Sequence, residues 1–361
     1  MPYLTDMYHD QNRRRHARQD GSPPVTADPE RQSPATFDPD TLTERLGARI
    51  LGQSPAVHSA VRALTLATAG VTDPGRPLAN LLLVGPTGVG KTELVRQIAA
   101  ELRSGPDDLC RVDMSSLAQE HYAASFTGAP PGYAGSKEAY SVFDRSTIEG
   151  DPYTPGIVLF DEVEKAHPTV LRALLHVLDN GRLRLANGQQ TISFRNSFVF
   201  LTSNLGSAEL ARRRASRWRR LAGPLATRLA ARGNQVTLDT AVREFFEPEF
   251  LNRIDETVVF TELDTATAER ITRLEIDLLR TRLRRRSVDL EVDDGVAALL
   301  TETGFDPVYG ARGLRRALRT ILAEPVATAI LRARGRTATP LHVHATTAGG
   351  QVTASTSPAK P

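Results

Sequence analysis

One short stretch of the chain has the residue types and the spacing that bind phosphate. The sequence GPTGVGKT, residues 85–92, matches the pattern G-x-x-x-x-G-K-[ST] at every fixed position. It follows an aliphatic run and precedes a helical pattern, so its glycines can turn backbone N–H groups around phosphate oxygens at a helix N-terminus. Lys91 is expected to reach the β- and γ-phosphates, and the Thr92 hydroxyl to ligate Mg²⁺. The predicted ATP-binding residues of this loop are Gly85, Pro86, Thr87, Gly88, Val89, Gly90, Lys91 and Thr92.

Two adjacent carboxylates favour hydrolysis as the reaction at this site. In IVLFDEVEKAHP, four apolar residues predict a buried strand whose carboxyl end carries Asp161 and Glu162. Asp161 is expected in the Mg²⁺ coordination sphere, and Glu162 is the candidate base that orients and deprotonates an attacking water. Small-molecule kinases and GTPases also carry a phosphate loop, so this carboxylate pair is the feature that predicts ATP and water as the reactants.

The elements that must position these residues are predicted by five short aliphatic runs. Continuous apolar strands that alternate with amphipathic helices, such as KTELVRQIAAELR, are typical of a three-layer α/β fold with a parallel sheet. After Leu263 the pattern becomes helical, which predicts a smaller, mostly helical second domain. The predicted strands are residues 80–85, 109–114, 156–162, 197–204 and 256–263.

Composition divides the 361 residues into two ordered domains between two polar tails. Residues 1–40 and 346–361 are poor in aliphatic residues and are expected to be disordered. The large α/β domain is expected at 41–262 and the small helical domain at 263–345.

Several classes of protein are disfavoured by composition. No apolar run reaches 18 residues, so no membrane span is expected, and the N-terminus lacks the apolar stretch of a secretory signal. The single cysteine, Cys110, allows no internal disulfide and fits a reducing cytoplasm. The net charge of +3 is too small to indicate a nucleic-acid partner by itself.

The chain resembles the second ATPase domain of the Clp-type AAA+ chaperones and unfoldases, the ClpA, ClpB and ClpC group. The resemblance extends from about Leu42 to Leu331 and depends on motifs that occur in the order of the family. It implies ATP hydrolysis in a homo-oligomeric ring, and six is the number of subunits in the family. The N-terminal domain and the first ATPase ring of the larger members have no counterpart among these motifs. The motifs are RILGQ, GPTGVGKTEL, GAPPGYAG, LFDEVEKAHP, LLHVLDNGRL, FRNSFVFLTSN, PEFLNRIDE and YGARGLRRAL.

The resemblance also implies roles for residues outside the phosphate loop. Asn204 matches sensor 1, which helps to hold the attacking water, and Arg312 matches sensor 2, which reaches the nucleotide of its own subunit. Arg253 matches the arginine finger, which is donated to the γ-phosphate in the neighbouring subunit. Ile50 and Leu51 match the apolar floor under the adenine.

The sequence GAPPGYAG corresponds to the axial pore loop of the family, with Tyr133 as the aromatic that grips a polypeptide substrate. Glycines allow such a loop to move and prolines limit its collapse, while tyrosine offers a large contact area at low rotamer entropy. The loop residues that the resemblance assigns to substrate are Gly132, Tyr133, Ala134 and Gly135.

Residues 211–232 depart from the family pattern. They contain eight arginines and no acidic residue, and they lack the Ile-Gly-Phe/Leu loop with which protease-coupled relatives dock on a peptidase, so no such peptidase partner is expected. A solvated basic helix, an acidic partner, a phosphate backbone and anionic lipid all fit this composition. Two alternatives to a remodelling motor therefore stay open: an ATP-controlled scaffold that recruits an acidic partner, and a nucleic-acid remodelling ATPase.

Overall fold

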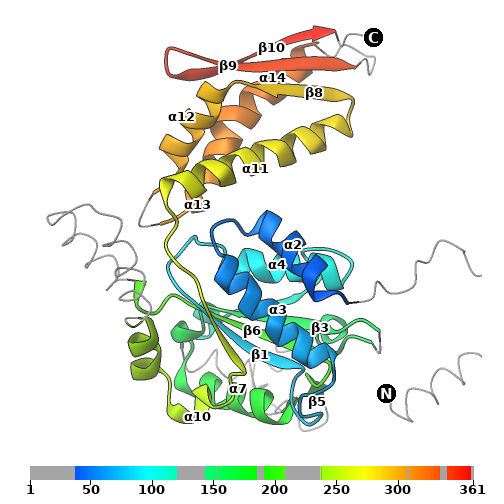
Figure 1. Cartoon of the computed structure of the whole chain (residues 1–361), viewed down its shortest axis with the longest axis vertical. Helices are drawn as coiled ribbons and strands as arrows, with labels where there is room; N and C mark the ends of the chain where they lie inside the picture. Colours follow the sequence, from blue (N-terminus) through cyan, green and yellow to red (C-terminus); the bar gives the residue numbers. More distant parts are fainter. Residues whose placement is uncertain are drawn as a thin grey trace, which may run out of the picture.

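The structure, a computed structural model, shows a larger α/β domain followed by a smaller C-terminal domain (Figure 1). Among the described residues, no helix combines the length and the apolar character needed to cross a bilayer. The described residues are 37–119, 143–151, 153–184, 191–207, 236, 238–306, 309–333 and 340–358.

A five-stranded parallel sheet with the order β2-β3-β6-β1-β7 forms the centre of the larger domain. Each of the five predicted runs overlaps one of these strands, so the prediction of the parallel sheet is confirmed. β1, β3 and β6 are buried at every position, as expected for strands that are covered on both faces. The bounds are β1 Ala79–Val84, β2 Cys110–Asp113, β3 Gly156–Asp161, β6 Ser197–Ser203 and β7 Glu256–Val259.

Helices cover both faces of the sheet and make it the middle of three layers (Figure 1). Side chains alternate between the faces of a strand, so Leu81 and Leu83 of β1 pack in the core with α2, α3 and α4. Leu82 and Val84 point to the other face and pack in a core with α7. The three-layer prediction is therefore confirmed. The bounds are α2 Pro39–Arg49, α3 Ser54–Thr68, α4 Lys91–Leu102 and α7 Pro168–Asn180.

Shorter elements complete the larger domain. A small antiparallel pair, β4 and β5, follows α7, and α10 lies just before β7 in the chain. These segments bring the chain from one sheet strand to the next on the α7 side. Their bounds are 3₁₀ helix η1 Met114–Leu117, α6 Arg145–Glu149, 3₁₀ helix η3 Val163–Lys165, β4 Arg182–Arg184, β5 Thr191–Ser193 and α10 Pro248–Leu251.

The smaller domain contains the predicted helices and, in addition, a three-stranded sheet that the sequence reading missed. The strand order is β10-β9-β8, with β8 parallel to β9 and β9 antiparallel to β10. Helices and sheet share a core of their own. The bounds are α11 Thr265–Arg284, β8 Val288–Val292, α12 Asp294–Gly304, α13 Arg312–Ala317, π-helix η4 Leu318–Ala323, α14 Glu324–Ala333, β9 Leu341–Ala348 and β10 Gln351–Pro358.

The prediction of a disordered tail at 346–361 is wrong for residues 346–358, because β9 and β10 form a hairpin there. Gly349 and Gly350 have φ values of 57° and 77°, the conformation of a two-residue hairpin turn that matches the twist of the strands. Val352 is buried in the core of the small domain and fixes the register. At the other end, α2 begins at Pro39 with Asp38 as its N-cap, inside the range that was expected to be a tail.

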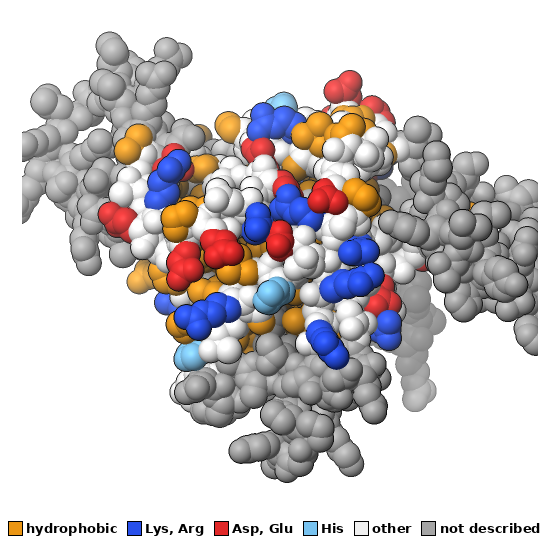
Figure 2. Space-filling view, turned by 90° about the horizontal axis from the view of Figure 1, so that it is seen from below, with side chains coloured by type: hydrophobic (Ala, Val, Ile, Leu, Met, Phe, Trp, Pro, Cys, Tyr) orange, Lys and Arg blue, Asp and Glu red, His pale blue; other side chains and the backbone are white. Residues whose placement is uncertain are grey.

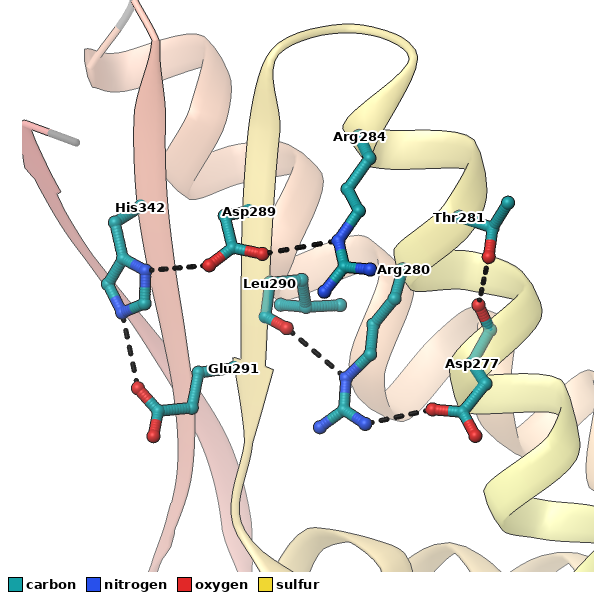
Figure 3. A network of polar contacts seen from close by, with 8 residues as sticks. All are labelled: Asp277, Arg280, Thr281, Arg284, Asp289, Leu290, Glu291 and His342. Carbon is teal, nitrogen blue, oxygen red and sulfur yellow. Dashed lines mark hydrogen bonds and ion pairs between the residues drawn. The ribbon is translucent and has the colours of Figure 1, made fainter. Parts of the chain in front are cut away.

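Polar side chains connect α11 to the outer face of this sheet (Figure 3). Arg280 donates through Nε to the Leu290 carbonyl at 3.2 Å and pairs with Asp277 at 2.9 Å. His342 lies between the Asp289 and Glu291 carboxylates, with N···O distances of 3.4 and 3.2 Å. This network belongs to the small domain alone.

Candidate active site

The turn between β1 and α4 contains residues 85–92. Gly85, Gly88 and Gly90 have φ values of 145°, 74° and 109°, which a residue with a Cβ rarely adopts. A Cβ on Gly88 would lie 2.1 Å from the carbonyl oxygen of Tyr309, in the small domain. The Ala311 N–H donates to the Gly88 carbonyl at 3.0 Å. The small domain therefore packs directly on the phosphate loop.

Lys91 is buried beneath this turn, with 7% of its surface exposed. Its Nζ donates to the Gly85 and Pro86 carbonyls, each at 2.7 Å, and to Asn204 Oδ1 at 2.9 Å. Burial lowers the pKa of Lys91 to about 8, although the carboxylates of Glu164 and Asp161 act in the opposite direction. A buried ammonium whose three acceptors are neutral oxygens is well matched to an incoming phosphate, because the anion would replace the lost hydration.

The pKa of Lys91 predicts how nucleotide affinity depends on pH. A bound phosphate favours the charged amine, so binding above pH 8 must be accompanied by proton uptake and becomes weaker as pH rises. We expect affinity for a fluorescent ATP analogue to fall roughly tenfold between about pH 7.5 and pH 9. Lys91→Met, which has no amine to titrate, should bind weakly with little change over this range. Equal pH dependence in wild type and Lys91→Met would contradict the assignment.

Asp161 and Glu162 lie at the carboxyl end of β3, next to the corresponding end of β6. Asp161 is 8% exposed and accepts a hydrogen bond from the Thr202 hydroxyl. Glu162 has a left-handed backbone conformation with φ 58°, and its N–H donates to Thr202 Oγ1 at 3.0 Å. A non-glycine residue in this conformation is strained, and here it separates the directions of two neighbouring carboxylates.

Asn204 connects the lysine to the candidate base. Its Oδ1 accepts from Lys91 Nζ, and its Nδ2 donates to Glu162 Oε1 at 3.4 Å. Its backbone N–H donates to Glu164 Oε1 at 3.1 Å. Asn204 is thus held at both its side chain and its backbone, between Lys91 of the phosphate loop and the carboxylates of Glu162 and Glu164. A residue that orients a water must be held in this way.

Three residues at this site were missed by the sequence reading. Thr202 bonds both Asp161 and the Glu162 backbone, Glu164 orients Asn204, and Arg111 of β2 pairs with Asp161 Oδ2 at 2.5 Å. Thr202 lies in a predicted strand and Glu164 follows the DE pair by two residues, so proximity in sequence was the available signal. For Arg111 no local signal existed, because its contact depends on the pairing of β2 with β3.

The residues present fit a nucleotide with a divalent cation. Thr92 and Asp161 supply the hard oxygen ligands that Mg²⁺ prefers, and both line one cavity. The Oε2 atom of Glu164 is buried and has no hydrogen-bond partner within the described ranges. A buried carboxylate oxygen without a partner is suited to an ordered water or to another polar group that enters the site.

The cavity has a volume of about 570 Å³ and lies between the two domains, which is within the range of small-molecule sites. The small domain contributes apolar side chains of α11, such as Leu274 and Leu278, together with Arg312 and Arg315. Arg315 pairs with Glu93 of α4 at 2.9 Å and with Glu275 of α11 at 2.8 Å, so it joins the domains at the rim. The predicted site residues that line this cavity are Ile50, Leu51, Thr87, Gly88, Val89, Gly90, Lys91, Thr92, Asp161, Glu162, Asn204 and Arg312.

Arg253, in contrast, does not line this cavity. It follows α10, and its Nε pairs with Asp179 Oδ1 at 2.8 Å, near the end of α7. The predicted substrate loop, residues 132–135 with Tyr133, and the arginine-rich residues 211–232 lie outside the described residues.

Comparison with known proteins agrees with this architecture. A family model described as "AAA domain (Cdc48 subfamily)" matches residues 76–257, and one for the C-terminal, D2-small domain of ClpB protein matches residues 263–343. An "ATP-dependent protease ATP-binding subunit-like protein" of Rhodococcus erythropolis is 61% identical over 98% of both chains. The protein AmiB of Pseudomonas aeruginosa, with the same description, is 44% identical over 82% of this chain and 80% of its own.

Longer relatives match over part of their length. The chaperone protein ClpB of Vibrio cholerae is 41% identical over 80% of this chain, which corresponds to 32% of ClpB. A closed-state cryoEM reconstruction of Hsp104 with ATPγS and FITC casein superposes with a TM-score of 0.70 at 27% identity, over 88% of this chain and 51% of that one. The order of motifs, the two domain matches and the cavity between the domains lead to one conclusion: the chain belongs to the Clp-type AAA+ ATPases and corresponds to their second ATPase domain.

Proposed function

We propose that this ATPase is a protein remodelling or unfolding motor that works as a homo-oligomeric ring, with six subunits as in the family. ATP is hydrolysed at the subunit interfaces, and the energy moves an unfolded polypeptide past the Tyr133 loop. The reaction is the attack of water on the γ-phosphate of ATP, which releases ADP and phosphate.

The observation that supports the ring most directly is the separation of the two arginines. Arg312 lines the cavity of its own chain, whereas Arg253 lies apart from it in an ion pair with Asp179. Positive charge beside the γ-phosphate stabilises the transition state. An arginine that does not line its own site can serve this purpose only at the site of a neighbouring subunit, which makes assembly a condition of catalysis.

Within one subunit, the predicted site residues divide the tasks of binding and hydrolysis between them. Lys91 and the glycine-rich turn bind the phosphates, and Thr92 and Asp161 hold Mg²⁺, which neutralises charge on the phosphate oxygens. Glu162 takes a proton from water while Asn204, fixed by Lys91 and Glu164, orients that water. Ile50 and Leu51, with the apolar side chains of α11, form the surface for the adenine.

The polypeptide substrate is proposed from the GAPPGYAG motif and from the likeness to an Hsp104 structure whose title names casein. Two relatives carry names that refer to a protease, but residues 211–232 lack the peptidase-docking sequence. We therefore propose a motor that releases its substrate without degradation, and we place it in the cytoplasm.

Steady-state ATP turnover, measured across the protein concentrations at which subunits associate, tests this function. We expect turnover per subunit to rise with assembly and to increase further when an unfolded polypeptide such as casein is added. Stimulation by DNA or RNA in place of polypeptide would favour a nucleic-acid remodeller. Slow turnover with every polypeptide, together with binding of an acidic partner through residues 211–232, would favour a scaffold.

Replacing Tyr133 by Ala is expected to separate the two activities. ATP turnover should stay near the wild-type rate, while unfolding of a fluorescent model substrate should be lost, because the aromatic contact area that grips the chain is removed. Tyr153→Ala is the matched control, since Tyr153 is 84% exposed and lies outside the motif. Unfolding by Tyr133→Ala at the wild-type rate would refute the gripping role.

A further inference from the structure

Two side chains connect the backbone of Arg253 to the end of α7 by hydrogen bonds. Asn80 Nδ2 donates to the carbonyl of Arg253 and to that of Leu178, each at 3.0 Å. Arg76 spans the same two carbonyls, with Nη2 donating to Arg253 at 2.8 Å and Nε to Leu178 at 3.3 Å. Asn80 is completely buried, so this double connection fixes where the arginine leaves the main chain.

The side chain of Arg253 pairs with a carboxylate at the end of α7. Its Nε lies 2.8 Å from Asp179 Oδ1, and the two side chains are 36% and 41% exposed. Among the described residues, no other carboxylate pairs with Arg253. The shortest contact of the ion pair is therefore made by the guanidinium nitrogen nearest to the main chain, whereas Nη1 and Nη2 form the bidentate end of the group.

Asp179 occupies a position that local helix energetics disfavours. It is the second-last residue of α7, whose last turn contains no basic residue, and the C-terminus of a helix carries partial negative charge. The helix ends at Gly181, in a left-handed conformation where a Cβ would meet Arg195 Cγ at 2.7 Å. The Asp179 carboxylate thus opposes the helix dipole beside Arg253. Departures from local sequence preferences occur mainly at functional sites, so we infer that Asp179 has a role outside the helix.

The end of the molecule formed by α7 and α10 (Figure 1) carries basic, acidic and hydrophobic side chains side by side (Figure 2). Arg253 lies two residues after the end of α10, and Asp179 lies near the end of α7. The main chain of Arg253 is thus held by Asn80 and Arg76, and its side chain is 36% exposed.

We propose that Asp179 is a positioning residue for Arg253: it holds Nε so that the terminal nitrogens meet the γ-phosphate in the neighbouring subunit. The inference rests on the proposed function, in which Arg253 acts between subunits. Asp179 touches no substrate itself, and its effect is carried to the neighbouring site through the guanidinium.

The variant Asp179→Asn tests this role with little disturbance of the fold. Asparagine keeps the size of the side chain and removes a charge that opposes the helix dipole, so α7 itself should not be weakened. We expect kcat for ATP to fall by roughly tenfold to a hundredfold, the effect of a misplaced transition-state group, with KM nearly unchanged. Asp277→Asn, which removes the acid of a similar ion pair with Arg280 in the small domain (Figure 3), should match wild type.

Mixed rings show whether the effect crosses the subunit boundary. Lys91→Ala subunits, which cannot hydrolyse ATP, are mixed with Arg253→Ala subunits, which keep their own phosphate site. Turnover then arises only where an Arg253→Ala site receives a finger from a Lys91→Ala neighbour. Adding Asp179→Asn to the Lys91→Ala subunit should lower this turnover roughly tenfold or more. Adding it to the Arg253→Ala subunit, which has no finger to position, should not.

The outcomes separate this inference from the proposed function. If Arg253→Ala alone leaves turnover unchanged, the interfacial mechanism itself is wrong. If Arg253→Ala abolishes turnover and Asp179→Asn turns over ATP at the wild-type rate, the positioning role is refuted while the interfacial mechanism stands. The same holds if Asp179→Asn is faster than wild type, because the ion pair would then keep Arg253 away from the γ-phosphate. An equal loss from either subunit in the mixed rings would show that Asp179 acts on the fold and also refute the inference.

Discussion

Replacing Glu162 with Gln is expected to reduce ATP turnover by roughly 10²–10⁴-fold, the contribution of a positioned general base, while nucleotide binding persists. The amide keeps the length of the side chain but cannot take a proton from water. The backbone N–H that donates to Thr202 is retained, and so is a side-chain oxygen able to accept from Asn204. Phosphate release and the affinity for a fluorescent ATP analogue, measured on the same preparation, separate chemistry from binding.

The control for this substitution is Glu101→Gln. Glu101 belongs to the same domain and pairs with Arg45 at 2.8 Å on the surface. Its replacement by Gln therefore removes the same charge at a position away from the cavity. Its turnover should equal that of wild type. Turnover of Glu162→Gln within a fewfold of wild type would mean that another group activates the water.

Replacing Arg253 with Ala is expected to lower turnover by roughly 10³–10⁵-fold, the range of arginine fingers in NTPases. The two donors that hold this residue, Asn80 and Arg76, bind its carbonyl oxygen and not its side chain, so alanine keeps the main-chain position. The lost ion pair with Asp179 is partly exposed and contributes about 0.2–1 kcal/mol of stability. Nucleotide affinity and thermal stability should therefore remain close to wild type.

Arg62→Ala is the matched control, because Arg62 is exposed and pairs with Glu256 at 2.7 Å on another part of the same domain. It should hydrolyse ATP at the wild-type rate. Dilution provides a second test, since single subunits have no neighbour to supply the finger and should be nearly inactive. Full turnover by demonstrably monomeric protein would refute the interfacial mechanism.

The centre of the site was predictable because its signals are local. The phosphate loop needs glycines and a lysine at fixed spacing, and β1, β3 and β6 are short, mainly apolar runs, as is typical of buried parallel strands. Asp161 and Glu162 follow directly from the end of such a run.

Contacts across the sheet could not be predicted in the same way. Arg111 reaches Asp161 because β2 lies beside β3, and Thr202 reaches it because β6 lies on the other side. The order β2-β3-β6 is a property of the tertiary fold and is not contained in the order of the motifs. The C-terminal hairpin was missed for another reason: its serines and threonines suggested disorder, whereas burial of Val352 and the two glycines of the turn stabilise strands.

Strand β1 carries Asn80 near its first residue and ends at Val84, directly before the phosphate loop. Its six residues span about 20 Å, and both of its edges are hydrogen-bonded to neighbouring strands, so the sheet holds the strand along its length. The residues that bind the phosphates and the amide that holds the Arg253 carbonyl thus stand at opposite ends of one element. Under the proposed interfacial mechanism, a single strand therefore positions both the nucleotide of one protomer and the arginine that this protomer offers to the next.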